Sequence, residues 1–334
     1  MAKSVKNKKN ILFVDDEERI IIALKLLFRR DRNINVFTTT NQAEAIDFVK
    51  NNQIHVVVSD MRMPGMNGAE LLSHVKKISP NTLRILLTGY SEMDNIIKSI
   101  NTGQVYRFLQ KPWDNEDIKA KIETAIQIAT SLWDNNICSE PESQKAISTI
   151  NKATESASLA PSSQSVLFIG NKNSTIFKTL TTHFDNIKIY HSSNAQKAVV
   201  AISKYENVMT VVVHTETYYH DVVTLLKILK GEFPMLVSVI VTNESDSELA
   251  ISLVNEAQVF RYLVEPVNNN QLCSDVTQAL NYSKTLSNSP ILVKQHTVEK
   301  VSQTEKNRLL DLIGFSFIGN LSQRFMKLKT LFGS

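Results

Sequence analysis

Polar residues of a few chemical types follow strand-length apolar segments in the first third of the chain. They are Asp15 and Asp16 after NILFV, Asp60 after VVVS, Thr88 after LRILL and Lys111 after VYRFLQ. In an open α/β sheet, functional sites form where the carboxyl ends of neighbouring strands meet. We therefore expect these side chains to lie together, although each one alone would be read as a helix cap, a turn residue or a solvated lysine.

Three carboxylates at one point would repel each other and shift each other's pKa unless a cation lay between them. Mg²⁺ suits such a site, because it takes oxygen ligands, keeps several waters and commonly binds one or two carboxylates together with a phosphate. A carboxylate beside Mg²⁺, an ammonium and a hydroxyl is arranged to attack a phosphoryl group whose oxygens they neutralise. Asp60 is the candidate nucleophile, with Lys111 and Thr88 as its catalytic partners.

The elements that must position these residues are five predicted β-α units between Asn10 and about Trp133. The predicted strands are 11–14, 35–39, 54–59, 83–88 and 105–109, and the predicted helices include 19–30, 95–101 and 114–133. Such alternation is typical of an α/β fold with a parallel sheet covered on both faces. In the strand order 2-1-3-4-5, the strands that carry the polar residues are neighbours.

The pattern repeats later in the chain. SVLFIGN echoes NILFVDD, VMTVVVHT echoes IHVVVSD, VSVIVTN echoes LRILLTG, and AQVFRYLVEP echoes GQVYRFLQKP. The intervals agree as well, since 44 residues separate Asp16 from Asp60 and also Asn171 from Thr215. The predicted organisation is a basic arm at 1–9, a first domain at 10–133, a linker at 134–164, a second domain at 165–286 and a tail at 287–334.

The second copy lacks the residues for this chemistry. Gly170 and Asn171 stand at the positions of the two early aspartates, Thr215 at that of Asp60 and Glu265 at that of Lys111, and only Thr242 and the ring of Tyr262 keep their type. A threonine hydroxyl without a base is a poor nucleophile, and magnesium would find few oxygen ligands. We expect a degenerate domain that keeps a surface for partners, with His214, Glu216 and His220 solvated rather than bound to metal.

Four motifs of the first copy, FVDDE, SDMRMPGMNG, LLTGYS and YRFLQKPW, resemble those of the receiver domain of bacterial two-component response regulators. The resemblance covers about 10–133. It implies a flavodoxin-like, doubly wound sheet of five parallel strands, which the repeat would supply twice. It also implies that Asp60 accepts phosphate from a histidine kinase or a histidine phosphotransfer protein, with Mg²⁺ held by Asp15, Asp16, Asp60 and the backbone carbonyl of Arg62.

The resemblance further implies a switch pair, Thr88 and Phe108. The hydroxyl would move to the phosphoryl group, which Lys111 contacts, while the ring turns inward. Arg62 and Tyr90 would flank that group. Self-catalysed phosphotransfer and autodephosphorylation would be the only catalysis, because the sequence has no nucleotide-binding loop and no paired-histidine metal motif.

The tail carries an apolar stripe at helical spacing. Its members are Leu310, Ile313, Phe317, Leu321, Phe325, Leu328 and Phe332. This stripe predicts an amphipathic helix that packs on the second domain, pairs in a homo-oligomer or binds a partner. Two hypotheses for the output follow: phosphorylation-controlled protein contacts through the second domain and tail, or transcriptional regulation with the basic tail on DNA.

Composition excludes some classes of protein. A net charge of +4 over 334 residues is too small to indicate nucleic-acid binding by itself. No apolar run approaches the roughly 20 residues of a membrane span, and Ile11 to Val14 is too short for the core of a secretory signal. With only Cys138 and Cys273, at no metal-ligand spacing, we expect a cytoplasmic protein.

Overall fold

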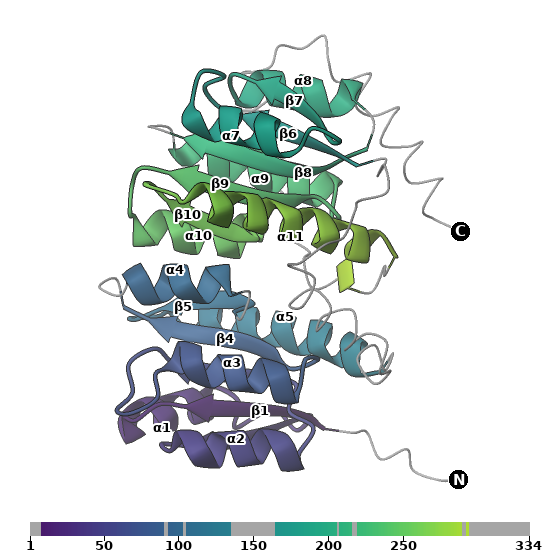
Figure 1. Cartoon of the computed structure of the whole chain (residues 1–334). Coiled ribbons are helices and arrows are strands. Elements are labelled where there is room, and N and C mark those ends of the chain that lie inside the picture. Colours follow the sequence, from purple (N-terminus) through teal and green to yellow (C-terminus); the bar gives the residue numbers. More distant parts are fainter. Residues whose placement is uncertain are drawn as a thin grey trace, which may run out of the picture. The chain divides into compact units, whose positions relative to one another are not determined.

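The computed structural model describes residues 8–89, 93–102, 105–134, 164–205, 207–215, 219–288 and 292–293. The chain divides into two compact units, Met1–Lys152 and Ala153–Ser334, here called the first and the second unit. Each unit contains one five-stranded sheet (Figure 1). The predicted tail helix at 302–332 lies outside the described residues, as do most of the predicted basic arm and linker.

The first sheet has five parallel strands in the order β2-β1-β3-β4-β5, as predicted. The strands are β1 (Lys9–Val14), β2 (Ile34–Thr39), β3 (Val56–Asp60), β4 (Leu83–Thr88) and β5 (Arg107–Gln110). All five residues of β3 are buried, as expected for a parallel strand that helices cover on both faces. β3 begins two residues later than predicted, because its pairing with β4 begins at Val56 opposite Leu83.

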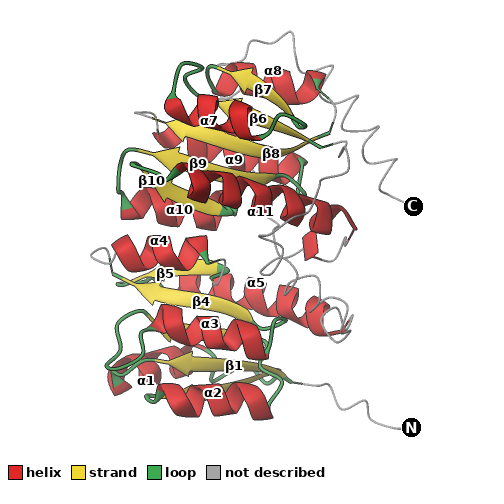
Figure 2. Ribbon diagram, in the orientation of Figure 1, coloured by secondary structure: helices red, strands yellow, loops and turns green. Residues whose placement is uncertain are grey.

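Among the described residues, helices flank this sheet (Figure 2). They are α1 (Glu18–Leu27), α2 (Gln42–Asn51), α3 (Gly68–Ile78), α4 (Met93–Asn101) and α5 (Asn115–Asp134). The side chains of Asn41 and Asn67 cap α2 and α3 by accepting hydrogen bonds from backbone N–H groups of the first turn. α1 ends three residues earlier than predicted, because the chain leaves the helix at Phe28, whose buried ring packs on Phe13 with centroids 6.0 Å apart.

The second unit has the same topology. Its parallel strands are β6 (Ser165–Ile169), β7 (Lys188–Ser192), β8 (Val208–Thr215), β9 (Val237–Thr242) and β10 (Arg261–Val264), in the order β7-β6-β8-β9-β10. Its helices are α7 (Thr175–His183), α8 (Ala195–Lys204), α9 (Tyr219–Glu232), α10 (Ser247–Ala257) and α11 (Asn269–Asn288). The chain therefore contains two doubly wound parallel sheets, as the internal repeat predicts.

Each unit has its own apolar core. In the second unit, strand residues such as Phe168, Val212 and Val239 pack with Leu272 and Val276 of α11. Both units also contain a cis X-Pro peptide bond directly after the last strand, Lys111–Pro112 and Glu265–Pro266. In the described part of the chain, no helix has both the length and the apolar composition needed to cross a membrane.

Candidate functional site

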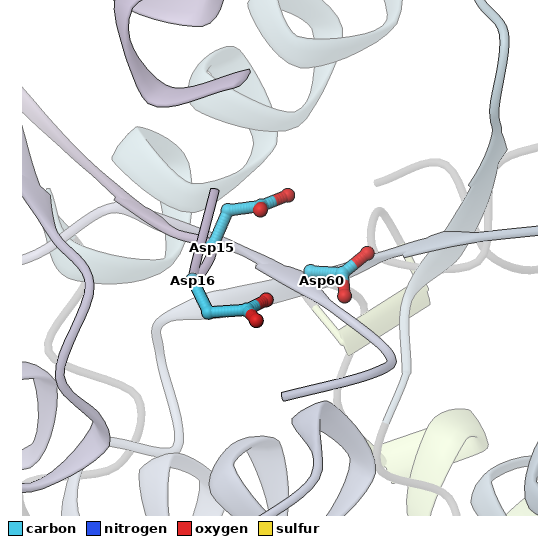
Figure 3. A group of neighbouring side chains, drawn as sticks. All are labelled: Asp15, Asp16 and Asp60. Carbon is cyan, nitrogen blue, oxygen red and sulfur yellow. The ribbon is translucent and has the colours of Figure 1, made fainter. Parts of the chain in front are cut away.

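Three aspartates gather at the carboxyl edge of the first sheet (Figure 3). Asp15 and Asp16 follow β1, Asp60 ends β3, and the two strands are neighbours, with Val14 paired to Ser59. One ligand oxygen from each aspartate lies within 4.8 Å of the others. Asp15 and Asp60 are buried, whereas Asp16 is exposed and approaches from the surface. The structure thus brings the three predicted carboxylates together.

Lys111 joins two of these carboxylates. Its Nζ lies 2.5 Å from Asp60 Oδ1 and 2.9 Å from Asp15 Oδ2. The backbone fixes the start of this side chain, since the Lys111 N–H donates to the Thr88 carbonyl at 2.9 Å. The sequence predicted that Lys111 lies at the site. It did not predict the contact with Asp15, because that contact depends on the conformation of the long lysine side chain.

Burial shapes the electrostatics of this group. Burial raises the pKa of Asp15, and the hydrogen bond and attraction from Lys111 offset this only in part. Burial acts to lower the pKa of Lys111, but its bonds to Asp60 and Asp15 outweigh that effect and leave the pKa above its usual value. The two directions are compatible, because the Asp15 side chain is 1% exposed and that of Lys111 is 23% exposed. Lys111 therefore stays protonated. The Asp15 carboxylate beside it has too little positive charge around it to offset the effect of burial.

The loop after β3 holds Asp60 in place. Asp60 Oδ2 accepts a hydrogen bond from the Arg62 N–H at 2.8 Å, so its two oxygens have different partners. α3 begins directly against this strand end, where a Cβ on Gly68 would lie 2.0 Å from the Asp60 carbonyl oxygen. Only glycine permits this approach. The Gln42 amide also donates to the Pro64 carbonyl at 3.1 Å, a support for the loop that no pattern in the sequence predicted.

Thr88 and Phe108, the predicted switch residues, lie on adjacent strands. Thr88 ends β4, and its buried hydroxyl donates to the Gly89 carbonyl at 2.9 Å. Phe108 lies on β5 opposite Leu86, and the residue is 1% exposed. Tyr90, the other predicted neighbour of the phosphoryl group, lies outside the described residues.

The corresponding edge of the second unit is built differently. Gly170, at the position of Asp15, has φ +150°, and a Cβ there would lie 2.7 Å from the His214 carbonyl oxygen. His214 Nε2 lies 3.4 Å from Glu265 Oε2, so a histidine–glutamate pair stands where the first unit has Lys111 and its aspartates. Within the described part of the chain, Asp15, Asp16 and Asp60 form the only group of three acidic, histidine or cysteine side chains close enough to share a metal ion. Glu216 and the side chain of His220 lie outside the description.

Comparisons with known proteins identify relatives of the first unit. A family model for the response regulator receiver domain matches residues 11–123. The chain is 32% identical over 123 residues to sporulation initiation phosphotransferase F of Bacillus subtilis, in a match that covers 37% of this chain and 98% of that protein. A receiver domain protein structure from Clostridium thermocellum is 34% identical, with 37% of this chain and 98% of that chain covered and a TM-score of 0.35.

Other relatives are longer proteins. The chain is 31% identical over 118 residues to the hydrogenase transcriptional regulatory protein HoxA of Bradyrhizobium diazoefficiens. This match covers 35% of this chain and 24% of that protein. The chain thus spans about a quarter of the length of this relative. Through its first unit, which gathers the acidic residues, the threonine and the lysine at one sheet edge, the chain belongs to the response regulator receiver family of two-component signalling.

Proposed function

We propose that the first unit accepts a phosphoryl group on Asp60 from a histidine kinase or a histidine phosphotransfer protein. The observation that supports this most directly is the convergence of Asp15, Asp60 and Lys111 within hydrogen-bonding distance at the carboxyl edge of the sheet. A helix cap or a solvated lysine would not need three separate strands to meet at one point. The arrangement suits group transfer to a carboxylate.

In the proposed step, a carboxylate oxygen of Asp60 forms a bond to phosphorus while the bond between phosphorus and the donor imidazole nitrogen breaks. The electron pair of that bond leaves with the imidazole, which takes up a proton. Charge builds up on the phosphoryl oxygens as the group transfers, and the Lys111 ammonium is placed to neutralise part of it. The Arg62 N–H holds the second oxygen of Asp60 and so orients the carboxylate.

The acidic residues fit a divalent cation. Their three oxygens lie within 4.8 Å, and burial raises the pKa of Asp15, so its carboxylate would be stabilised by more positive charge than Lys111 supplies. Asp15, Asp16, Asp60 and the Arg62 carbonyl would hold Mg²⁺. When bound, the ion would supply charge neutralisation for the phosphoryl oxygens. Its ligands are all oxygen atoms, which matches the preference of magnesium rather than of zinc.

Thr88 and Phe108 would carry the phosphorylated state outward. Thr88 ends β4, the strand beside that of Asp60, Phe108 lies on the next strand, β5, and both residues are buried. The second unit would then act as a degenerate receiver that makes protein contacts. Its histidine–glutamate pair and the backbone at Gly170 support this assignment, since this edge has no aspartate at the positions of Asp15 and Asp60. We place the protein in the cytoplasm, where such donors act.

The test is phosphoryl incorporation into the full chain. The protein is incubated with acetyl phosphate and MgCl₂, and intact-mass spectrometry follows the added group. Asp60→Asn should abolish incorporation, while Thr215→Ala and Asp47→Asn, an exposed carboxylate outside the site, should leave it unchanged. Incorporation that survives in Asp60→Asn would refute the assignment.

The alternative output, DNA binding through the basic tail, predicts a different result. Promoter DNA would then bind the chain with an affinity that falls steeply with salt. The proposed protein-contact output instead predicts capture of a kinase or partner that changes with Asp60→Asn. Comparison of the two assays on the same preparation separates them.

A further inference from the structure

Exposed positive charge gathers at one end of the second unit, on α7, β7, α8 and the loops between them. The described residues from Gln164 to Tyr205 include one acidic residue, Asp185, and five exposed lysines. These lysines, here called the basic end, are Lys172, Lys178, Lys188, Lys197 and Lys204. None of them forms an ion pair with another described residue, since Lys197 Nζ donates to Ser193 Oγ at 3.1 Å and Lys204 Nζ lies 5.7 Å from the centroid of the Tyr205 ring.

Negative charge gathers on α10 and the loop before it. Four acidic residues lie between Val237 and Val264, all exposed or half-buried, and here called the acidic end: Glu244, Asp246, Glu248 and Glu256. The basic residue of this stretch, Arg261, is 7% exposed and bonds to buried Asp275 at 3.1 Å, so its charge is used inside the unit. Lys227 of α9 reaches Glu256 at 3.4 Å and offsets only part of this charge.

The lysines of the basic end do not stabilise the helices that carry them. A helix dipole favours negative charge in the first turn, and α1 and α2 have Glu18 and Glu44 there. α7 and α8 have no acidic residue in the first turn. Lys197 is the third residue of α8, as Glu44 is of α2, so a positive charge stands where the dipole favours a negative one. This placement favours a contact with another molecule.

The two charged ends cannot meet within one unit. β7 and β10 are the two edge strands of the second sheet, and α7 and α8 lie at the opposite end of the unit from α10 (Figure 1). Two copies of the chain can instead bring unlike ends together. We propose that the basic end of one second unit binds the acidic end of the second unit in another copy, so that the protein associates head to tail. This self-association goes beyond the proposed phosphoacceptor function and does not require it.

A second copy fits the charges better than a nucleic acid does. A nucleic acid would use the basic end alone and would be repelled by the acidic end, whereas a second copy uses both. The interface is of the heterologous kind, which leaves one end of each kind free, so association should grow with protein concentration. Because the charges are exposed, salt should weaken it.

Sedimentation velocity of the full chain, without a phosphoryl donor, tests the proposal. In about 0.05 M salt the sedimentation coefficient should rise with protein concentration, and the rise should be much smaller in about 0.5 M salt. A basic-end variant, Lys188→Glu with Lys197→Glu, and an acidic-end variant, Glu244→Lys with Glu248→Lys, should each self-associate at least about tenfold more weakly than the unchanged protein. An equimolar mixture of the two variants should regain association, because each supplies the charge that the other lacks.

The matched control is Lys25→Glu with Lys284→Glu, which makes the same change in net charge at exposed lysines outside the basic end and should associate as the unchanged protein does. Glu244→Gln with Glu248→Gln removes the negative charges without reversing them and should also weaken association, which keeps the test decisive if the reversed variant fails to fold. Circular dichroism melting identifies the folded variants.

An unchanged protein that stays monomeric in low salt would overturn the proposal, as would folded variants that associate normally or a mixture of folded variants that does not recover. A single-stranded oligonucleotide that binds the monomer, and is lost in the basic-end variant, would assign the basic end to nucleic acid instead. Phosphoryl incorporation plays no part in these measurements, so their failure would leave the proposed function of Asp60 standing.

Discussion

The Lys111 ammonium lies 2.5 Å from Asp60 Oδ1, on the same carboxylate that would bind a divalent cation. A lysine and a metal ion at this distance share one set of negative charges. They repel each other, yet both can stabilise a phosphoryl group that arrives with its own negative charge. The same side chain should therefore oppose metal binding and favour phosphorylation.

Lys111→Gln should bind Mg²⁺ more tightly, by about threefold to tenfold, because the competing ammonium is removed. Phosphoryl incorporation from acetyl phosphate should nevertheless slow by at least about tenfold, since a charge that stabilises the transferring group is lost. Fluorescence of half-buried Trp113, two residues beyond Lys111, provides the binding signal. Weaker Mg²⁺ binding in this variant would show that Lys111 organises the site rather than competes for it.

Gly68→Ala should disrupt the first unit, because the new Cβ would lie 2.0 Å from the Asp60 carbonyl oxygen. Neither the start of α3 nor the end of β3 can shift without losing packing. We expect a loss of at least about 2 kcal/mol in the free energy of unfolding. Urea unfolding followed by tryptophan fluorescence reports on this unit alone, since the chain's two tryptophans are Trp113 and Trp133. Gly89→Ala is the control, as a Cβ there meets nothing within 4 Å. Equal stability of the two variants would contradict the packing argument.

Restoring an aspartate to the second unit should not restore a metal site. Gly170→Asp would place a side chain at φ +150° and 2.7 Å from the His214 carbonyl oxygen, so the unit should lose stability instead. In the Asp60→Asn background, even the pair Gly170→Asp and Thr215→Asp should show no Mg²⁺-dependent incorporation. Gly170→Ala separates the backbone effect from the carboxylate and should lose similar stability. Phosphoryl incorporation in the double variant would mean that the second edge differs from the first only in residue type.

The first unit should lose stability as the solution becomes acidic, through His55. Burial lowers the pKa of His55 to about 4, and its Nδ1 accepts the Asn10 N–H at 3.1 Å, so the folded state keeps the ring neutral. Between pH 6.5 and about 4 the unfolded state binds the proton more readily than the folded state. Stability therefore decreases as the pH is lowered through that window. The contribution is about 2 kcal/mol between pH 7.5 and pH 5.

His55→Asn should therefore flatten the pH dependence of urea unfolding over this range. Trp133, whose ring centroid lies 6.4 Å from that of His55, supplies a local fluorescence signal. Exposed His74→Asn is the control and should leave the slope unchanged. The same slope in His55→Asn as in the unchanged protein would assign the acid sensitivity to other groups.

The sequence by itself determined the repeated β-α pattern and the residue types at the carboxyl edge of each sheet. These follow from local rules, because buried parallel strands are apolar and side chains with chemistry lie where strands end. It also determined that the second copy lacks the aspartates and the lysine, since that is a matter of residue identity.

Only the tertiary structure decided which groups touch. The bond from Lys111 to both Asp15 and Asp60 depends on the reach of a flexible side chain across two strands. The backbone at Gly170 lies against His214, which is 44 residues away in the sequence. The Tyr262 hydroxyl bonds to Glu244, which is 18 residues away. Periodicity carries no information about such contacts, because they arise from packing between segments whose separation along the chain has no fixed relation to their distance in space.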